Sequence, residues 1–324
     1  MQRLRAALSD DDLPPGGPHL GRYYGSADPS MGERFEALAR EAFDVKHAYA
    51  VCNGTSGLHA ALLAVGAGPG KEVICPGMGF IATSMAGAIT GATPVFCDVD
   101  ASLQMDPSKL EALITERTVA VIPTHHWGFV CDMGPVVEIA ERHGVKVIED
   151  CAQAPGASYR GRPVGSIGDI GCFSISSYKI IGGGEGGMVV TSDDALFDRI
   201  RQAAEAGGLW RPDRFAAPRY EGELFPGANY RMSELESAIN MVQMKKLPGV
   251  VSRHRHVWGL IREQLRDYAG IQWQKSNDPD GDIGYMMRFF PTDDELGRKL
   301  VEALRAECIN AGYRGSGARP DWHV

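Results

Sequence analysis

Short apolar segments alternate with amphipathic ones along most of this chain, and that alternation restricts the folds it can adopt. The apolar segments are rich in β-branched residues, which favour strands, and helical spacing of apolar residues separates most of them. Such alternation predicts an α/β fold with a mainly parallel, seven-stranded sheet, helices on both faces, and ligands at the carboxyl ends of the strands. The expected strands lie at 48–52, 72–75, 94–99, 119–123, 145–148, 171–175 and 188–191. The expected helices lie at 31–43, 57–65, 81–89, 107–114 and 133–143.

The alternation ends near Asn240, where a second and smaller unit is expected to begin. A chain of 324 residues is long for one core, so two domains are the ordinary expectation. The remainder predicts a charged helix over 241–265, a short strand at 286–290 and a helix over 293–311. We therefore expect an N-terminal arm over 1–19, a large domain over 20–245 and a smaller α+β domain over 246–324.

Charge and cysteine usage argue against several classes of partner. The chain carries 33 Lys and Arg against 41 Asp and Glu, and this net charge of -8 disfavours nucleic acid and anionic membranes. Its seven cysteines are scattered and include no Cys-x-x-Cys pair, so we expect reduced thiols in a cytoplasmic protein and no metal site. No run in the sequence approaches the roughly 20 apolar residues of a membrane span.

Residues 53–57 read Asn-Gly-Thr-Ser-Gly and lie between an expected strand and an expected helix. A helix that begins here directs backbone N–H groups and the positive end of its dipole outward, beside the hydroxyls of Thr55 and Ser56. This arrangement suits a phosphate group. Simple N-capping by Asn53 or Thr55 accounts for the same residue types.

Asp150 and Lys179 are the two charged residues that most suggest catalysis. Asp150 ends an expected strand, so its carboxylate can pair with a pyridinium nitrogen at the binding edge or merely cap a helix. Lys179 comes 29 residues later, and its amine can form a Schiff base with an aldehyde cofactor. The glycine-rich stretch 182–187 follows the lysine and lacks the spacing of a nucleotide-phosphate loop. It indicates a tight turn and disfavours hydride transfer.

Aromatic and histidine residues follow two other expected strands. Phe80 opens a helix, where its ring can stack on a flat cofactor or simply pack in the core. His125 and His126 suggest acid/base chemistry. A metal site there is disfavoured because no third ligand lies nearby.

Several short motifs follow one another along the chain. They are Asn53-Gly54-Thr55-Ser56, Phe80-Ile81-Ala82-Thr83, Asp98-Val99-Asp100, His125-x-x-Gly128, Glu149-Asp150-Cys151-Ala152-Gln153-Ala154, Phe173-Ser174, Lys179, Gly184-Glu185-Gly186-Gly187 and Asn229-Tyr230-Arg231. In this order they resemble the DegT/DnrJ family of sugar aminotransferases, which have pyridoxal-phosphate fold type I. The resemblance covers about residues 20–245 and implies that this large domain binds the cofactor.

The resemblance implies pyridoxal 5'-phosphate as the cofactor and a role for each residue near its ring. Lys179 would bind the cofactor as a Schiff base and would then move the proton between substrate and cofactor. Asp150 would pair with the pyridine nitrogen and Phe80 would stack on the ring. Gln153 would lie against the other side of the ring or near its hydroxyl.

The same resemblance implies a phosphate site that two subunits share. Thr55, Ser56 and Ser174 would hold the phosphate group within one subunit. Asn229 would reach in from the second subunit, so the active sites would lie at the interface of a homodimer.

The implied reaction moves an amino group from glutamate or glutamine to a keto sugar carried on a nucleotide. Two alternatives are a keto-cyclitol acceptor and a catalytically inactive relative, whereas Lys179 argues against a dehydratase branch that has histidine instead. Pro155 and Ile180 stand where many members carry histidine and asparagine, so the substrate pocket is expected to differ. The chain also ends short of the usual small domain, and we expect part of the acceptor site to lie outside it.

Overall fold

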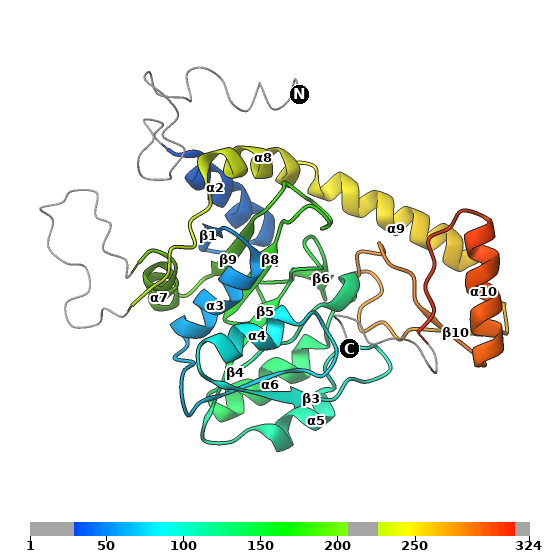
Figure 1. Cartoon of the computed structure of the whole chain (residues 1–324), viewed down its shortest axis with the longest axis horizontal. Coiled ribbons are helices and arrows are strands. Elements are labelled where there is room, and N and C mark those ends of the chain that lie inside the picture. Colours follow the sequence, from blue (N-terminus) through cyan, green and yellow to red (C-terminus); the bar gives the residue numbers. More distant parts are fainter. Residues whose placement is uncertain (1–28, 207–225, 315–324) are drawn as a thin grey trace, which may run out of the picture.

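A seven-stranded sheet forms the centre of the computed structural model, which describes residues 29–206 and 226–314 (Figure 1). Its strands are β1 (His47–Val51), β2 (Glu72–Pro76), β3 (Thr93–Cys97), β4 (Thr118–Val121), β5 (Lys146–Asp150), β8 (Ile170–Ser174) and β9 (Gly187–Thr191). The strand order is β1-β9-β8-β5-β4-β2-β3. β9 runs antiparallel to both neighbours, and the other pairs are parallel. The predicted mainly parallel α/β sheet is therefore confirmed.

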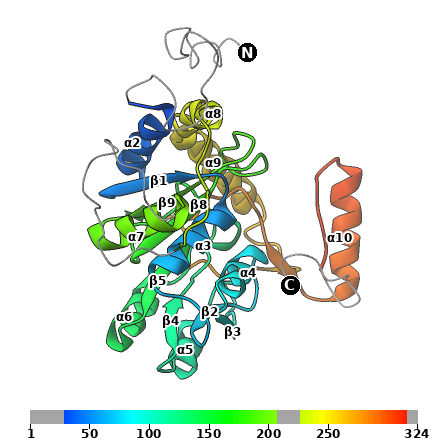
Figure 2. The same cartoon turned by 60° about the vertical axis from the view of Figure 1, so that its left-hand side comes forward.

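Helices cover both faces of this sheet (Figures 1 and 2). One layer contains α3 (Gly54–Ala64), α4 (Ala82–Ile89) and α7 (Asp194–Ala204), and the other contains α2 (Met31–Phe43), α5 (Pro107–Leu110), α6 (Met133–His143) and α8 (Glu234–Met244). Alternate residues of β1 enter the two cores, with Tyr49 on the α3 side and Ala48 on the α2 side. The inner strands of the sheet are buried on both faces and are therefore mainly apolar, whereas β3, at one edge, is partly exposed.

The helix predicted over 31–43 is confirmed as α2, and its ends have identifiable causes. Ser30 and Glu33 form a capping box at its start. Asp44 ends it in the left-handed conformation, with φ 51°. Glu234 of α8 accepts a hydrogen bond from the Met31 N–H at 2.6 Å, which joins the two helices.

The segment predicted as one helix over 241–265 belongs to two helices instead. α8 ends at Met244, and α9 (Leu247–Gln264) follows after a short break. Pro248 lies in the first turn of α9. A proline ring clashes with the carbonyl four residues earlier and provides no N–H, so one unbroken helix cannot pass through this position.

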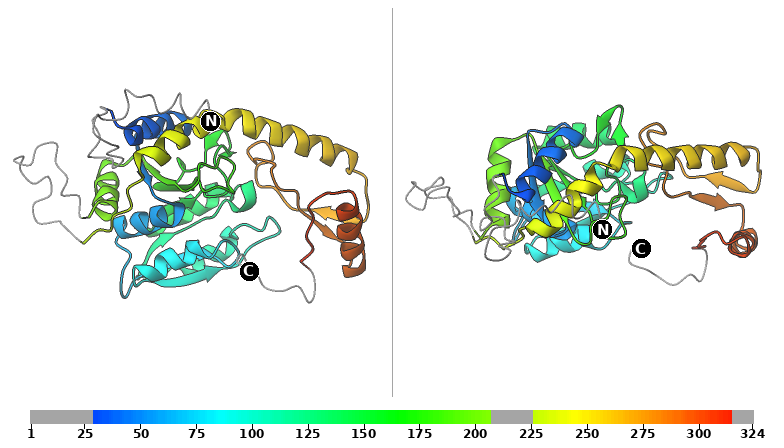
Figure 3. Two further views of the ribbon diagram at one scale, coloured as in Figure 1. Left: turned by 45° about the horizontal axis from the view of Figure 1, so that its top comes forward. Right: turned by 90° about the horizontal axis from the view of Figure 1, so that it is seen from above.

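A small α+β unit follows α9, which leads away from the sheet (Figure 3). It contains the antiparallel pair β10 (Ile271–Trp273) and β11 (Phe289–Pro291), and then α10 (Asp294–Ala306). β11 overlaps the predicted strand at 286–290, whereas β10, which has the same length, was not predicted. The boundary at 245/246 stays a prediction, and the expected arm over 1–19 lies outside the described residues.

Shorter elements complete the described chain. They are the 3-10 turns η2 (Glu111–Leu113) and η3 (His126–Gly128) and the hairpin of β6 (Ser158–Tyr159) and β7 (Arg162–Pro163). No helix within 29–206 or 226–314 has the length and apolar character needed to cross a membrane.

Candidate functional site

A cavity of about 500 Å³ opens where β4, β5 and β8 end, at the edge of the sheet that binds ligands in open α/β folds. Most of the candidate residues line it, namely Thr55, Ser56, Phe80, Asp150, Gln153, Ser174 and Lys179. Asn229 is exposed and does not line this cavity, although its neighbour Tyr230 does. The fold therefore gathers into one site residues from four separate segments of the chain.

One end of the cavity forms where the start of α3 meets the end of β8. Asn53 caps α3 by accepting a hydrogen bond from the Ser56 N–H at 2.8 Å, which confirms the capping interpretation for that residue. Gly54 permits the close approach of the two elements, because a Cβ there would lie 2.8 Å from the Cβ of Ser174. The dipole of α3 and the hydroxyls of Thr55, Ser56 and Ser174 together suit an anion.

Asp150 ends β5 with its side chain turned into the cavity and only 4% of the residue exposed. Its Oδ2 accepts a hydrogen bond from the Thr83 hydroxyl at 2.7 Å, and its Oδ1 accepts one from the Ala152 N–H at 3.0 Å. These two donors hold both carboxylate oxygens in place. The carboxylate is therefore already fixed in position and can pair with a cationic nitrogen without a further loss of conformational entropy.

Lys179 lies in the loop between β8 and β9, and its Nζ is 5.9 Å from the centre of the Phe80 ring. Burial lowers the pKa of the Lys179 amine, and the negative charge of Asp150 offsets part of that effect. A lower pKa leaves more of the amine neutral, which is the form that attacks a carbonyl carbon or removes a proton.

His125 is placed differently from the sequence-based expectation. His125, Glu149 and Cys151 bring potential metal ligands within 4.8 Å of one another, although no third ligand was expected near the histidines. The His125 Nδ1 accepts a hydrogen bond from the Cys131 N–H at 3.1 Å, so Nε2 carries the proton and donates it to Glu149 at 3.0 Å. Both ring nitrogens are therefore engaged in holding the fold, and the acid/base interpretation of His125 receives no support from this geometry.

Three residues in or beside the cavity were given no role from the sequence, although Thr83 and Tyr230 lie in motifs quoted above. Thr83 holds Asp150 and lies in the motif that Phe80 begins. His59 follows Thr55 by one helical turn, a spacing that could have revealed it. The Tyr230 hydroxyl meets the His59 Nδ1 at 2.9 Å across 171 residues, a contact that no local pattern predicts. Burial lowers the pKa of His59.

The groups around the cavity fit pyridoxal phosphate. Its aldehyde requires an amine, which Lys179 provides, and its ring nitrogen requires a carboxylate, which Asp150 provides. Its phosphate requires an anion site, which the start of α3 provides. Phe80 adds an aromatic face to the same cavity. The close packing of Gly54 on Ser174 brings the start of α3 against the end of β8, so that hydroxyls from both elements line one cavity.

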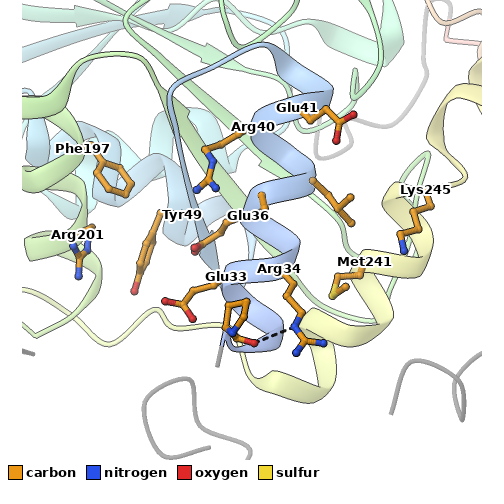
Figure 4. Close-up of a pocket in the computed structure, with 13 residues that line it drawn as sticks. Glu33, Arg34, Glu36, Arg40, Glu41, Tyr49, Phe197, Arg201, Met241 and Lys245 are labelled. Atoms are coloured by element: carbon orange, nitrogen blue, oxygen red, sulfur yellow. Dashed lines mark hydrogen bonds between the residues drawn. The ribbon is translucent and has the colours of Figure 1, made fainter. Parts of the chain in front are cut away.

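A larger cavity, of about 670 Å³, lies beside α2, α7 and α8 (Figure 4). Its lining mixes acidic residues such as Glu33 with basic ones such as Arg40 and Lys245. The Arg34 Nε donates a hydrogen bond to the Pro29 carbonyl. The smaller cavity contains the amine and carboxylate that chemistry on a carbonyl requires. We therefore take the smaller cavity as the functional site.

The sheet and the smaller cavity correspond to the class of enzymes that bind pyridoxal phosphate on a fold type I scaffold, as the sequence-based resemblance implied. Residues 29–313 match the DegT/DnrJ/EryC1/StrS aminotransferase family, and the chain belongs to that family.

Individual relatives are named for different compounds. GDP-perosamine synthase of Caulobacter vibrioides is 44% identical over 234 residues, which are 71% of this chain and 61% of that protein. L-glutamine:2-deoxy-scyllo-inosose aminotransferase of Micromonospora echinospora is 38% identical over 266 residues, which are 81% of this chain and 61% of that protein. The match therefore spans less than two thirds of the length of either relative.

A solved structure confirms the fold. The crystal structure of DesI in the presence of its TDP-sugar product superposes with a TM-score of 0.74 at 33% identity. The superposition covers 95% of this chain and 74% of DesI.

Proposed function

We propose that this chain transfers an amino group from glutamate or glutamine to a keto sugar linked to a nucleotide, with pyridoxal phosphate as cofactor. The observation that carries this proposal is the pair of half-buried Lys179 and buried Asp150 in one cavity. Membership of an aminotransferase family supports the reaction class. The cytoplasmic location expected from the sequence stays a prediction.

Pyridoxal phosphate, when bound, supplies an electron-accepting ring that stabilises negative charge on the substrate carbon. Thr55, Ser56 and Ser174 would hold the phosphate group at the start of α3, and Phe80 would offer its aromatic face to the ring. Asp150 would keep the ring nitrogen protonated, because its carboxylate, held by Thr83 and Ala152, favours a cation beside it.

Lys179 has two roles in this proposal. Its Nζ would hold the aldehyde carbon of the cofactor through a C=N bond, with loss of water. When released from that bond, the neutral Nζ would be the group of this chain that accepts a proton from the substrate carbon and later returns one. Burial favours the neutral amine that both steps need.

A nucleotide-linked sugar is the preferred acceptor. The relative with 44% identity is named for a GDP-linked product, and DesI was solved with a TDP-sugar. A keto-cyclitol is the second candidate, because the scyllo-inosose aminotransferase is 38% identical. Comparison of kcat/KM for a nucleotide-linked keto sugar and for a free keto-inositol decides between them.

We also propose that two copies form a homodimer with shared active sites. α4 and the residue before it expose Ile81, Met85 and Ile89 on one helical face, and Phe96 of β3 is 59% exposed. Exposed apolar residues that gather on one face are typical of an interaction surface. Asn229, which lies outside its own cavity, would reach the phosphate site of the partner.

Absorbance spectroscopy tests the reaction. The wild-type protein with pyridoxal phosphate should show the band of a lysine-bound cofactor, and glutamate should remove that band. Lys179→Ala should abolish both the band and amino transfer, whereas Lys46→Ala, at an exposed ion pair with Asp194, should keep both. A Lys179→Ala protein that keeps its band and activity refutes the proposal. A wild-type protein that stays colourless supports the inactive relative.

A further inference from the structure

The loop between β8 and β9 carries Lys179 and is closed by hydrogen bonds of its own backbone. The Lys179 N–H donates to the Ser176 carbonyl at 2.9 Å. At the base of the loop, the Gly183 N–H donates to the Ile175 carbonyl at 3.1 Å, and the Ile175 N–H donates to the Gly186 carbonyl at 2.8 Å. The conformation of these few residues therefore determines where the lysine side chain begins.

Helix α8 contacts this loop through two side-chain amides. Asn240 is 0% exposed, and its Nδ2 donates a long hydrogen bond to the Glu185 carbonyl at 3.5 Å, across 55 residues of sequence. Gln243, on the next turn of α8, donates from its Nε2 to the Gly182 carbonyl. Glu185 lines the cavity together with Lys179. The helix therefore contacts the backbone of the same loop that lines the cavity.

The Asn240 amide occupies the space that two glycines of the loop leave open. A Cβ at Gly183 would lie 1.8 Å from the Asn240 Oδ1, and a Cβ at Gly186 would lie 2.6 Å from the Asn240 Nδ2. At both positions this side chain provides the nearest atom. A short side chain that is fully buried in a packed interior has little freedom to move away. The loop therefore requires glycine at 183 and 186 because of one residue on α8.

Hydrogen bonding alone does not account for this side chain. The Asn240 Oδ1 is buried and accepts no hydrogen bond within residues 29–206 and 226–314. A buried acceptor without a donor is destabilising, so an apolar residue would satisfy the interior better. What the amide provides is close contact with the loop on the side of the two glycines.

We propose that Asn240 is a positioning residue for Lys179. Its side chain fills the space beside Gly183 and Gly186, fixes the loop between β8 and β9, and so holds the lysine amine in the cavity. The inference rests on the proposed function, because Lys179 would form the C=N bond to the cofactor. Asn240 does not itself line the cavity, so it acts through the loop.

Paired affinities for pyridoxal phosphate and pyridoxamine phosphate test the position of the lysine. Pyridoxamine phosphate has the same ring and phosphate but an amine in place of the aldehyde, so it forms no C=N bond with Lys179. Asn240→Ala should weaken the affinity for pyridoxal phosphate about tenfold and leave that for pyridoxamine phosphate within about twofold, because only the first depends on where the lysine lies. Equal weakening of both affinities, or no change in either, overturns the proposal.

A double substitution tests the steric contact. Gly183→Ala should weaken the affinity for pyridoxal phosphate at least about a hundredfold, because its Cβ would lie 1.8 Å from the Asn240 Oδ1. When Asn240→Ala is added, the nearest remaining atom is the Ile239 Cγ2 at 3.4 Å, which is an ordinary contact. The affinity of the double variant should therefore return to within about threefold of that of Asn240→Ala. A double variant that does not recover overturns the proposal.

Gly281→Ala is the matched control for that rescue. Its Cβ would also lie 1.8 Å from an oxygen, the Ser158 carbonyl, but Gly281 does not line the cavity. Gly281→Ala should lower stability, leave the ratio of the two affinities unchanged, and gain nothing from Asn240→Ala. A control that Asn240→Ala rescues equally well overturns the proposal.

Hydrogen exchange in the protein without cofactor separates this inference from the proposed function. Asn240→Ala should accelerate exchange of the Lys179 and Gly183 amides about tenfold, because the loop loses the group packed against it. A wild-type protein without a lysine-bound band refutes the proposed function, and accelerated exchange in Asn240→Ala then still supports the contact between α8 and the loop. Unchanged exchange refutes the positioning role even if Gly183→Ala does not fold.

Discussion

Replacement of Glu149 by glutamine removes one buried negative charge and keeps the shape of the side chain. Glu149 is 0% exposed and lies next to Asp150 on β5. Its two oxygens accept hydrogen bonds from four N–H donors, which are the backbone groups of Gly165, Ile167 and Gly168 and the ring Nε2 of His125. Each oxygen accepts two of these bonds, at 2.7 Å and 2.7 Å for Oε1 and at 2.9 Å and 3.0 Å for Oε2.

An amide keeps only one accepting oxygen, so two of the four donors would face an NH₂ group. His125 cannot relieve this conflict by moving its proton to Nδ1, because Nδ1 already accepts from the Cys131 N–H. A buried donor without an acceptor costs about 1–3 kcal/mol, so Glu149→Gln should lower the free energy of unfolding by about 4 kcal/mol. That is a large part of the total of about 5–15 kcal/mol for a folded protein.

Urea unfolding of the protein without cofactor measures this loss. With an m value of about 3 kcal/mol per M, the midpoint should fall by about 1.3 M. Glu138→Gln, at a side chain that is 74% exposed, is the control and should leave the midpoint unchanged. A shift of less than about 0.3 M in Glu149→Gln would show that the four hydrogen bonds do not hold this edge of the sheet.

Three further variants test other parts of the structure. Gly54→Ala should weaken the affinity for pyridoxal phosphate about tenfold, measured by equilibrium dialysis, because the new Cβ would lie 2.8 Å from that of Ser174 and push α3 away; unchanged affinity would contradict the phosphate site. Burial raises the pKa of Asp282 to about 6, so the folded state binds its proton more tightly than the unfolded state does. The stability from that proton is present at low pH and is lost as the pH rises through about 6. The wild-type protein should therefore lose up to about 3 kcal/mol of unfolding free energy between pH 4 and 7 that Asp282→Asn does not lose, measured by urea unfolding. Parallel pH profiles of the two proteins would contradict the raised pKa. Ile89→Asp, at a residue that is 64% exposed on α4, should convert a dimer into monomers in light scattering, and a variant that stays dimeric would exclude this face as the interface.

Local patterns predicted most of the fold. α2 was found at its observed bounds because its apolar residues recur at helical spacing. All seven strands of the sheet were found because each is a short, mainly apolar segment, and in the inner strands this reflects burial on both faces. The break before α9 was missed although Pro248 marks it, and β10 was missed although β11, of the same length, was found.

The cavity was predictable where residues follow strand ends. Asp150 and the segment that contains Thr55 were expected at the carboxyl edge of a parallel sheet, and both line the cavity there. Tyr230 was missed because its partner His59 lies 171 residues away. Thr83 was missed because its hydroxyl reaches Asp150 across 67 residues of sequence.

The sequence by itself determined the sheet, the edge at which ligands bind and the amine and carboxylate that meet there. These depend on hydrophobic periodicity and on residue types at strand ends, which are local properties. Only the tertiary structure decided that His125 is engaged through both ring nitrogens and that the oxygen of Gln153 faces Trp127. The physical reason is that the donor or acceptor role of a buried side chain depends on the groups packed against it, and those groups come from distant parts of the chain.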